Sequence, residues 1–122
     1  MIATFAGAIH EGYLDRKVQK IWKIYCMSVV FGWDENKAAQ NVKKHGVRFE
    51  EAMTVFCDPL ALIFPDDDHS VDERREIILG CTLKGTLLMI CFAETEQDVV
   101  RIFSARRITR GERKDYEENT KR

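Results

Sequence analysis

Basic side chains that can bind phosphate are concentrated in one segment near the end of the chain. Residues 101–114 hold five arginines and one lysine against a single acid, Glu112, although the whole chain has a formal net charge of only −1. Guanidinium groups stay charged and bind phosphate oxygens through two parallel hydrogen bonds. The segment therefore predicts a local site for a phosphate-rich ligand such as a nucleic acid.

A second set of polar side chains recurs at helical spacing earlier in the chain. Lys37, Asn41 and His45 stand at i, i+4 and i+8, so one face of a helix would carry all three, with Lys44 beside them. This stripe is a candidate part of the same site. An equally simple interpretation gives His45 a structural role in the last helical turn, where it covers the Gly46 that ends the helix.

Strict alternation along the arginine-bearing strand determines which of its side chains share a face. It places Arg101 and Arg107 on one face and Arg106 on the other, so only one of Arg106 and Arg107 can point into a given site unless the strand is bulged or already turning there. Of the two, Arg107 is expected in the site, because it shares a face with Arg101. Arg101 stands among apolar neighbours, and an unpaired guanidinium is costly to bury. It therefore either pairs with Glu73 or Glu76 on a neighbouring strand or faces an open site.

An acidic run at residues 66–68 stands beside His69 and Asp72 and invites comparison with a metal site. Consecutive carboxylates on a loop point in different directions, and the spacing matches neither an EF-hand loop nor a zinc motif. The run is expected to be a solvated turn. The sequence thus predicts neither a metal nor another cofactor.

The elements that would position these side chains can be placed from capping and turn signals. Asp34 is a good N-cap for a helix that ends at Gly46, and Thr109 with Glu112 forms a capping box for a last helix. Apolar spacing predicts a second helix at residues 49–56. Strand-like segments lie at residues 28–33, 60–64, 74–82, 86–94 and 99–107.

These elements predict an α+β fold, in which two N-terminal helices pack on an antiparallel sheet of about four strands, followed by a C-terminal helix. The last three strands should form a meander. Its middle strand, residues 86–94, is apolar on both faces and needs a cover on each side. The helix pair would provide one cover, and an N-terminal helix, a partner chain or both would provide the other.

Residues 1–28 differ in character from the rest and are predicted to be an N-terminal extension of a domain at residues 29–122. Apolar residues at near-helical spacing are interspersed with arginine and lysine, which indicates a basic amphipathic helix. Packing on the domain is the simpler role for it, and an arm that contacts RNA or a membrane surface is the alternative. The residues that define the spacing are Ile9, Tyr13, Val18, Trp22 and Tyr25.

The composition fits one soluble globular domain. The chain has 122 residues, of which 45% are hydrophobic and 32% charged, well away from the range of disordered chains. Its four cysteines form no C-x-x-C pair and are expected to be reduced. Neither a signal peptide nor an apolar run long enough to span a membrane is recognised, so the cytoplasm is the expected compartment.

In addition, residues 31–116 resemble the BrnT family, the toxin halves of type II toxin–antitoxin pairs. The resemblance depends on several short strings that occur in the family's order and spacing. They are FGWDENKAAQNVKKHGVRFEEA at 31–52, DERR at 72–75 followed by IILG at 77–80, RIFSARR at 101–107 and ERKDY at 112–116.

The resemblance implies a RelE/ParE-like fold and a small metal-independent endoribonuclease that inhibits translation and growth. It also implies neutralisation by a ribbon-helix-helix antitoxin similar to BrnA. That antitoxin would repress the operon, so the toxin would meet operator DNA only through it. The most characteristic family positions fall on Lys44, His45, Glu73, Arg74, Arg106 and Arg107.

RNA cleavage without a metal uses the neighbouring 2′-OH as the nucleophile. A base takes the proton of that hydroxyl, cations stabilise the charge of the phosphorane, and an acid protonates the leaving oxygen. We expect Glu73 or His45 to be the base. Tyr116 or His45 would be the acid.

The remaining candidates are cations. A non-catalytic module that docks an antitoxin or a nucleic acid with the same basic residues is the competing interpretation. The expected residues are Arg74, Arg106 and Arg107 for charge stabilisation, and Lys37, Lys44 and Arg101 for substrate binding.

Overall fold

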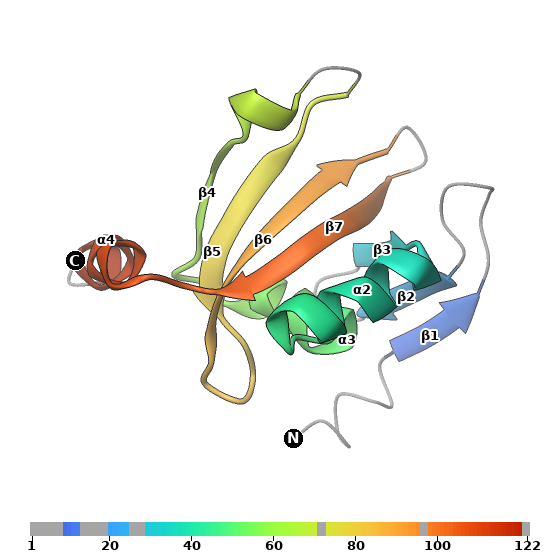
Figure 1. Cartoon of the computed structure of the whole chain (residues 1–122), viewed down its shortest axis with the longest axis horizontal. Coiled ribbons are helices and arrows are strands. Elements are labelled where there is room, and N and C mark those ends of the chain that lie inside the picture. Colours follow the sequence, from blue (N-terminus) through green and yellow to red (C-terminus); the bar gives the residue numbers. More distant parts are fainter. Residues whose placement is uncertain (1–8, 13–19, 25–28, 71–72, 96–97, 121–122) are drawn as a thin grey trace.

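The fold is a single mixed β-sheet flanked by short helices (Figure 1). A computed structural model of the chain describes residues 9–12, 20–24, 29–70, 73–95 and 98–120. The seven strands lie in the order β1-β2-β3-β7-β6-β5-β4. In chain order they are β1 (Ile9–Gly12), β2 (Lys20–Ile24), β3 (Val29–Trp33), β4 (Leu62–Pro65), β5 (Glu76–Cys81), β6 (Leu87–Glu94) and β7 (Val99–Arg107).

The three predicted meander strands are confirmed as β5, β6 and β7, which pair antiparallel with their neighbours. The expectation of a wholly antiparallel sheet is wrong at one place, because β3 pairs with β7 in parallel, with Val30 opposite Val99 and Gly32 opposite Arg101. Alternation and turn signals identify a strand but not its neighbour, so the sequence did not reveal this pairing. It puts β7 in the middle of the sheet (Figure 1).

The N-terminal helix predicted within residues 1–28 is wrong where the structure describes this segment. β1 and β2 form an antiparallel pair there, and β2 pairs with β3 from Lys20 opposite Trp33 to Ile24 opposite Val29. Pairing with the free edge of β3 satisfies backbone groups that a helix would leave exposed, and such tertiary demands override weak helical spacing. The other residues of the predicted helix lie outside the described residues, as does Cys26.

The helices begin and end at the predicted signals. Asp34 caps the first helix by accepting hydrogen bonds from the amides of Asn36 (2.8 Å) and Lys37 (3.1 Å), and Gly46 ends it at φ 69°. The capping box of Thr109 is confirmed before the last helix. The predicted second helix divides into a short α-helix and a 3₁₀ helix. The elements are α2 (Glu35–His45), α3 (Phe49–Ala52), η1 (Met53–Cys57), η2 (Asp67–His69) and α4 (Arg110–Thr120).

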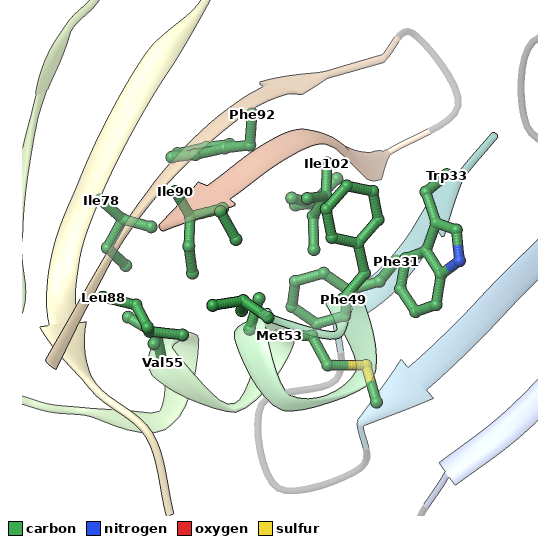
Figure 2. Close-up of a cluster of buried hydrophobic side chains, with 14 residues drawn as sticks. Phe31, Trp33, Phe49, Met53, Val55, Ile78, Leu88, Ile90, Phe92 and Ile102 are labelled. Atoms are coloured by element: carbon green, nitrogen blue, oxygen red, sulfur yellow. The ribbon is translucent and has the colours of Figure 1, made fainter. Parts of the chain in front are cut away.

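One face of the sheet carries the hydrophobic core, which α3 and η1 cover (Figure 2). Phe31 and Trp33 of β3 meet the side chains of this helical segment edge-to-face. The Phe31 ring lies 4.9 Å from Phe56, and the Trp33 ring lies 5.7 Å from Phe49. The other fully buried large side chains of this core are Met53, Val55, Ile78, Leu88, Ile90 and Ile102.

Helix α2 lies along β7 and completes its hydrogen bonding. β3 pairs with only the first part of β7, which leaves Ala105 without a strand partner on that side. Asn41, only 5% exposed, takes this place: its amide nitrogen donates to the carbonyl of Ala105 (2.8 Å) and its oxygen accepts from the amide of Ala105 (3.1 Å). The same amide nitrogen donates to the carbonyl of Val47 (3.0 Å). Asn41 thereby fixes α2 beside the sheet.

Among the described cysteines, Cys81 and Cys91 are free thiols, which agrees with the expectation of reduced side chains. Cys57, Cys81 and Cys91 are all half-buried. Across the described ranges, no helix combines the length and the apolar character that crossing a membrane requires.

Candidate functional site

A cavity of about 580 Å³ lies on the face of the sheet opposite the core. Helix α2 forms one wall, β5, β6 and β7 form the floor, and the turn around η2 forms the other wall. We call this cavity the cleft. Its lining side chains are Lys37, Gln40, Asn41, Lys44, His45, Asp66, Asp68, His69, Arg75, Ile77, Met89, Cys91, Phe103, Ser104 and Arg106.

The floor of the cleft explains why β6 is apolar on both faces. Leu88 and Ile90 point into the core, while Met89 and Cys91 point into the cleft and are half-buried. A second cover for β6 was expected from an N-terminal helix or a partner chain. On this face, α2 and the η2 turn flank the strand instead and form the walls of the cleft. Apolar side chains set among polar ones are typical of a ligand site.

A β-bulge decides which arginine of β7 enters the cleft. Cys91 pairs with Ser104 but Phe92 pairs with Ile102, so Phe103 is an extra residue that shifts the alternation. After the bulge, Arg106 lies on the cleft side, whereas Arg107 is exposed and stands opposite Leu88 of the core face. The expectation that Arg107 shares the site with Arg101 is therefore wrong, and Arg106 takes that position.

Arg106 is held in place by Glu112. Its two terminal nitrogens donate to the two carboxylate oxygens at 2.9 and 2.8 Å, and it also contacts Met89 Sδ at 3.0 Å. The hydrogen bonds from Arg106 lower the pKa of Glu112 to about 2, against a smaller opposing effect of burial. The pair in turn raises the pKa of Arg106. Arg106 is consequently a fixed cation at the rim of the cleft.

Three cations surround the ring of Phe103. Arg75 stacks with its guanidinium carbon 3.9 Å from the ring centroid, Arg101 lies at 4.6 Å, and the Lys37 ammonium lies at 5.3 Å. A smaller cavity of about 250 Å³ adjoins the cleft here and is lined by Lys37, Arg101 and Phe103, among others. Basic groups from α2, β7 and the segment before β5 thus contact the ring of Phe103 at the bulge.

Arg101 pairs with Glu73, which confirms the ion-pair alternative for this strand arginine. Glu73 is consequently engaged and does not line the cleft. Its neighbour Arg74 is exposed and lines neither cavity, whereas Arg75 enters the cleft. Arg75 is not among the predicted site residues, because the predicted strand at residues 74–82 begins before β5 does and the alternation of side chains is not defined there.

His45 and Lys44 stand on the α2 wall, as the helical stripe predicted. Tyr116 does not join them. Its hydroxyl donates to Asp58 Oδ2 at 2.7 Å, and the same oxygen accepts from the amide of Cys81 at the end of β5. Burial, and then this contact with a carboxylate, raise the pKa of Tyr116 above its ordinary value. The structure therefore gives Tyr116 a place in packing α4, away from the cleft.

The acidic run forms part of the opposite wall. Asp66 is 8% exposed and accepts hydrogen bonds from His69 Nδ1 (2.9 and 3.0 Å) and from Cys91 Sγ (3.3 Å). Burial raises the pKa of the Asp66 carboxyl, but these hydrogen bonds and the nearby charges of His69 and Arg75 outweigh it, so the pKa is lowered. Burial and Asp66 raise the pKa of Cys91 to about 12.

The acidic run was expected to be a solvated turn, yet Asp66 is buried in the cleft wall. Within the described part of the chain, no three His, Cys, Asp or Glu side chains are grouped closely enough to hold a metal ion.

Comparison with known proteins identifies the family of this chain. A family model described as "Ribonuclease toxin, BrnT, of type II toxin-antitoxin system" matches residues 33–112, about two thirds of the chain. The chain belongs to the BrnT family. A search of curated proteins finds no match. The crystal structure of the Brucella abortus ribonuclease toxin BrnT is similar in fold, at 21% identity and a TM-score of 0.50, covering 64% of this chain and 94% of that one.

The part of the chain that matches the BrnT family contains the whole cleft. It begins at Trp33, the end of β3, and ends at Glu112, which holds Arg106. Tyr116 and the paired strands β1 and β2 lie outside it. Membership of a type II toxin family implies an antitoxin partner and an RNA substrate.

Proposed function

We propose that this chain is an endoribonuclease toxin and that its cleft is the active site. One observation supports this most strongly: basic groups from distant parts of the sequence meet in the cleft. Lys37, Lys44 and His45 come from α2, and Arg75 and Arg106 come from the segment before β5 and from the end of β7. Family membership supplies the reaction class, because the family is one of ribonuclease toxins.

The dimensions of the cleft suit a piece of single-stranded RNA. A volume of about 580 Å³ lies within the usual range for small-molecule sites, which runs from about 300 to 1,000 Å³. A nucleotide would occupy it with its phosphate near Arg75 and Arg106. Both are guanidinium groups, which match the oxygens of a phosphate or of a phosphorane better than ammonium groups do.

The proposed reaction needs no metal. The 2′-oxygen attacks the adjacent phosphorus as its proton passes to a base, and the bond from phosphorus to the 5′-oxygen breaks as an acid protonates that oxygen. The products are a 2′,3′-cyclic phosphate and a 5′-hydroxyl. Arg75 and Arg106 would stabilise the charge on the non-bridging oxygens, while Lys37 and Lys44 would hold the flanking phosphates.

The geometry revises the expected acid–base groups. His45 faces the cleft and keeps its proposed role. Glu73 is paired with Arg101, and Tyr116 is bonded to Asp58, so neither reaches the cleft. We therefore remove both from the proposed mechanism and retain Arg101 as a residue that borders the adjoining smaller cavity.

The test compares two pairs of adjacent arginines, Arg74 with Arg75 and Arg106 with Arg107. In each pair only one arginine lines the cleft. Arg75→Ala and Arg106→Ala should each lower the cleavage rate of single-stranded RNA by about 100-fold or more, measured in EDTA. The matched controls are Arg74→Ala and Arg107→Ala, which remove the same charge from side chains outside the cleft. These controls should stay within about threefold of the unmodified chain.

The products decide between cleavage and binding. Cyclic-phosphate ends on the fragments would support the proposed enzyme. Tight, salt-sensitive binding that leaves the RNA intact would contradict it and favour a binding module. Equal loss of cleavage in all four arginine variants would contradict the assignment of the cleft, since overall charge would then explain the effect.

We further propose that the antitoxin partner is a ribbon-helix-helix protein which represses the operon, so that operator DNA is contacted through it alone. Membership of a type II family supports an antitoxin but not its fold. Induced expression of this chain should stop growth and degrade RNA, and co-expression with the ribbon-helix-helix protein of the same operon should restore both. Continued toxicity despite a stable complex with that protein would contradict this partner.

A further inference from the structure

The wall opposite α2 carries a second histidine whose position is built into the fold. His69 ends η2 and lines the cleft, with its Nδ1 at 2.9 and 3.0 Å from the two carboxylate oxygens of Asp66. The side chain of His69 is 65% exposed, whereas the side chain of Asp66 is only 10% exposed. An exposed imidazole is thus tethered by a buried carboxylate.

Asp66 is held rigidly enough to orient a partner. Its amide donates to the carbonyl of Arg75 (2.9 Å), and its carbonyl accepts from the hydroxyl of Ser70 (2.7 Å). Ser70 in turn accepts from the amide of Arg75 (3.0 Å). The side chain of Asp66 also accepts from Cys91 on the cleft floor. These bonds fix the carboxylate between the turn, β6 and the segment before β5.

The tether selects one tautomer of His69. A carboxylate accepts hydrogen bonds and does not donate them, so the Nδ1 that faces Asp66 must carry the proton. In the neutral imidazole, the lone pair is then on Nε2, the nitrogen that Asp66 does not contact. This is the arrangement of a general base oriented by a carboxylate.

We infer that His69 is the general base of the ribonuclease site and that Asp66 is its positioning residue. The inference rests on the proposed function, and it fills the role that Glu73 leaves open. The cleft would then have one imidazole on each wall, His45 on α2 and His69 on η2, and Arg75 and Arg106 line the same cleft. In-line displacement requires a base and an acid on opposite sides of the phosphorus.

Nε2 of His69 takes the proton of the 2′-hydroxyl while the 2′-oxygen forms its bond to phosphorus. The bond to the 5′-oxygen breaks, and protonated His45 gives that oxygen its proton. Solvent then returns both imidazoles to their starting states. The other charged or titratable groups that line the cleft with His69 are Lys37, Lys44, His45, Asp66, Asp68, Arg75, Cys91 and Arg106.

The first measurement separates catalysis from binding. His69→Gln should lower the cleavage rate by about 10²- to 10⁴-fold, with RNA affinity within about threefold of the unmodified chain. Asp66→Asn should also lower the rate of RNA cleavage. Asp67→Asn is the matched control, because Asp67 begins the same turn, is exposed and does not line the cleft. Thermal unfolding should show that all three variants are folded.

The second measurement separates base from acid. An RNA whose leaving 5′-oxygen is replaced by sulfur needs no proton on the leaving group, since a thiolate leaves readily. Such a substrate should restore much of the rate of His45→Ala but little of that of His69→Gln. The rise in rate from acid to neutral pH, which reports a base losing its proton, should be present in the unmodified chain and absent in His69→Gln.

The outcomes distinguish this inference from the proposed function. If the unmodified chain cleaves RNA and His69→Gln cleaves it at a similar rate with the same pH profile, the inference is wrong and the proposed function stands. Rescue of His69→Gln by the sulfur substrate would also overturn the assignment as base. If the unmodified chain leaves RNA intact, both fail together.

Discussion

Arg106 and Glu112 form a bidentate ion pair across the turn that joins β7 to α4, with nitrogen–oxygen distances of 2.9 and 2.8 Å. The same carboxylate accepts a hydrogen bond from the amide of Thr109 at 2.8 Å and so caps α4. One side chain therefore starts the last helix and also positions the cation at the rim of the cleft. A substitution of Glu112 should therefore affect both the start of α4 and the position of Arg106.

We predict that Glu112→Gln loses stability in a pH-dependent way. The pKa of Glu112 is lowered to about 2 in the folded chain, below its ordinary value of 4.5. The pair therefore stabilises the fold fully above about pH 5, and this stabilisation is lost as the pH falls through the folded pKa. At pH 7 the variant should be less stable by about 1 kcal/mol, since the Arg106 side chain is 39% exposed and solvent weakens the pair.

Thermal unfolding at pH 7 and near pH 2 measures this effect. The melting temperatures of the unmodified chain and of Glu112→Gln should converge at the lower pH. An equal difference at both pH values would show that the charge of Glu112 is not what stabilises the junction.

Asn41 should be among the most costly polar side chains to replace. Asn41→Leu keeps the size of the side chain but leaves three buried backbone groups, of Val47 and Ala105, without their partner. We expect a loss of about 3 kcal/mol in the free energy of unfolding, measured with urea. Lys43→Leu on the exposed side of α2 is the control and should change it by less than about 0.5 kcal/mol. A comparable loss in both would mean that the introduced leucine, and not the lost bridge to Ala105, is responsible.

Tyr116→Phe should separate structure from catalysis. The substitution removes only the hydroxyl that donates to Asp58, which keeps a second hydrogen bond from the amide of Cys81 at 2.8 Å. The free energy of unfolding should fall by about 1 kcal/mol. The RNA cleavage rate should stay within about twofold, because Tyr116 does not line the cleft. A loss of 100-fold at full occupancy of the folded state would restore Tyr116 as the catalytic acid.

Two glycines should respond in opposite directions to alanine. A Cβ at Gly80 would lie 2.9 Å from Ala61 Cβ and 3.0 Å from Val55 Cγ1, so η1 and the segment before β4 would have to move. We expect Gly80→Ala to cost about 1–3 kcal/mol. At Gly111 the nearest atom is 4.0 Å away, and alanine favours a helix, so Gly111→Ala should add about 0.5–1 kcal/mol. Urea unfolding of the two variants tests the contrast, and destabilisation of both would contradict it.

Local signals in the sequence were reliable guides to the fold. The caps at Asp34 and Thr109 and the glycine at Gly46 depend on hydrogen bonds within a few residues, and the structure has all three where expected. Lys37 and His45 both line the cleft, as their helical spacing predicted, because the geometry of a helix is set by its own backbone.

Features that depend on distant strands were not predictable in the same way. The bulge at Phe103 is defined by the register between β6 and β7, and it reversed the choice between the two adjacent arginines. The parallel partner of β7 and the pairing of β2 with β3 are likewise set between segments. The Asp66–His69 pair was judged by its spacing alone, which does not show that the carboxylate is buried.

The position of β7 in the middle of the sheet affects how the chain acquires activity during synthesis (Figure 1). This strand is the last of the seven to be made, and it supplies the bulge and Arg106 to the cleft. At about 5–20 residues per second, the ribosome needs roughly 4 to 15 s to pass from the end of β3 to the end of β7. A nascent chain therefore lacks its cleft until β7 has been synthesised, which would delay the proposed attack on RNA near the ribosome that is making it.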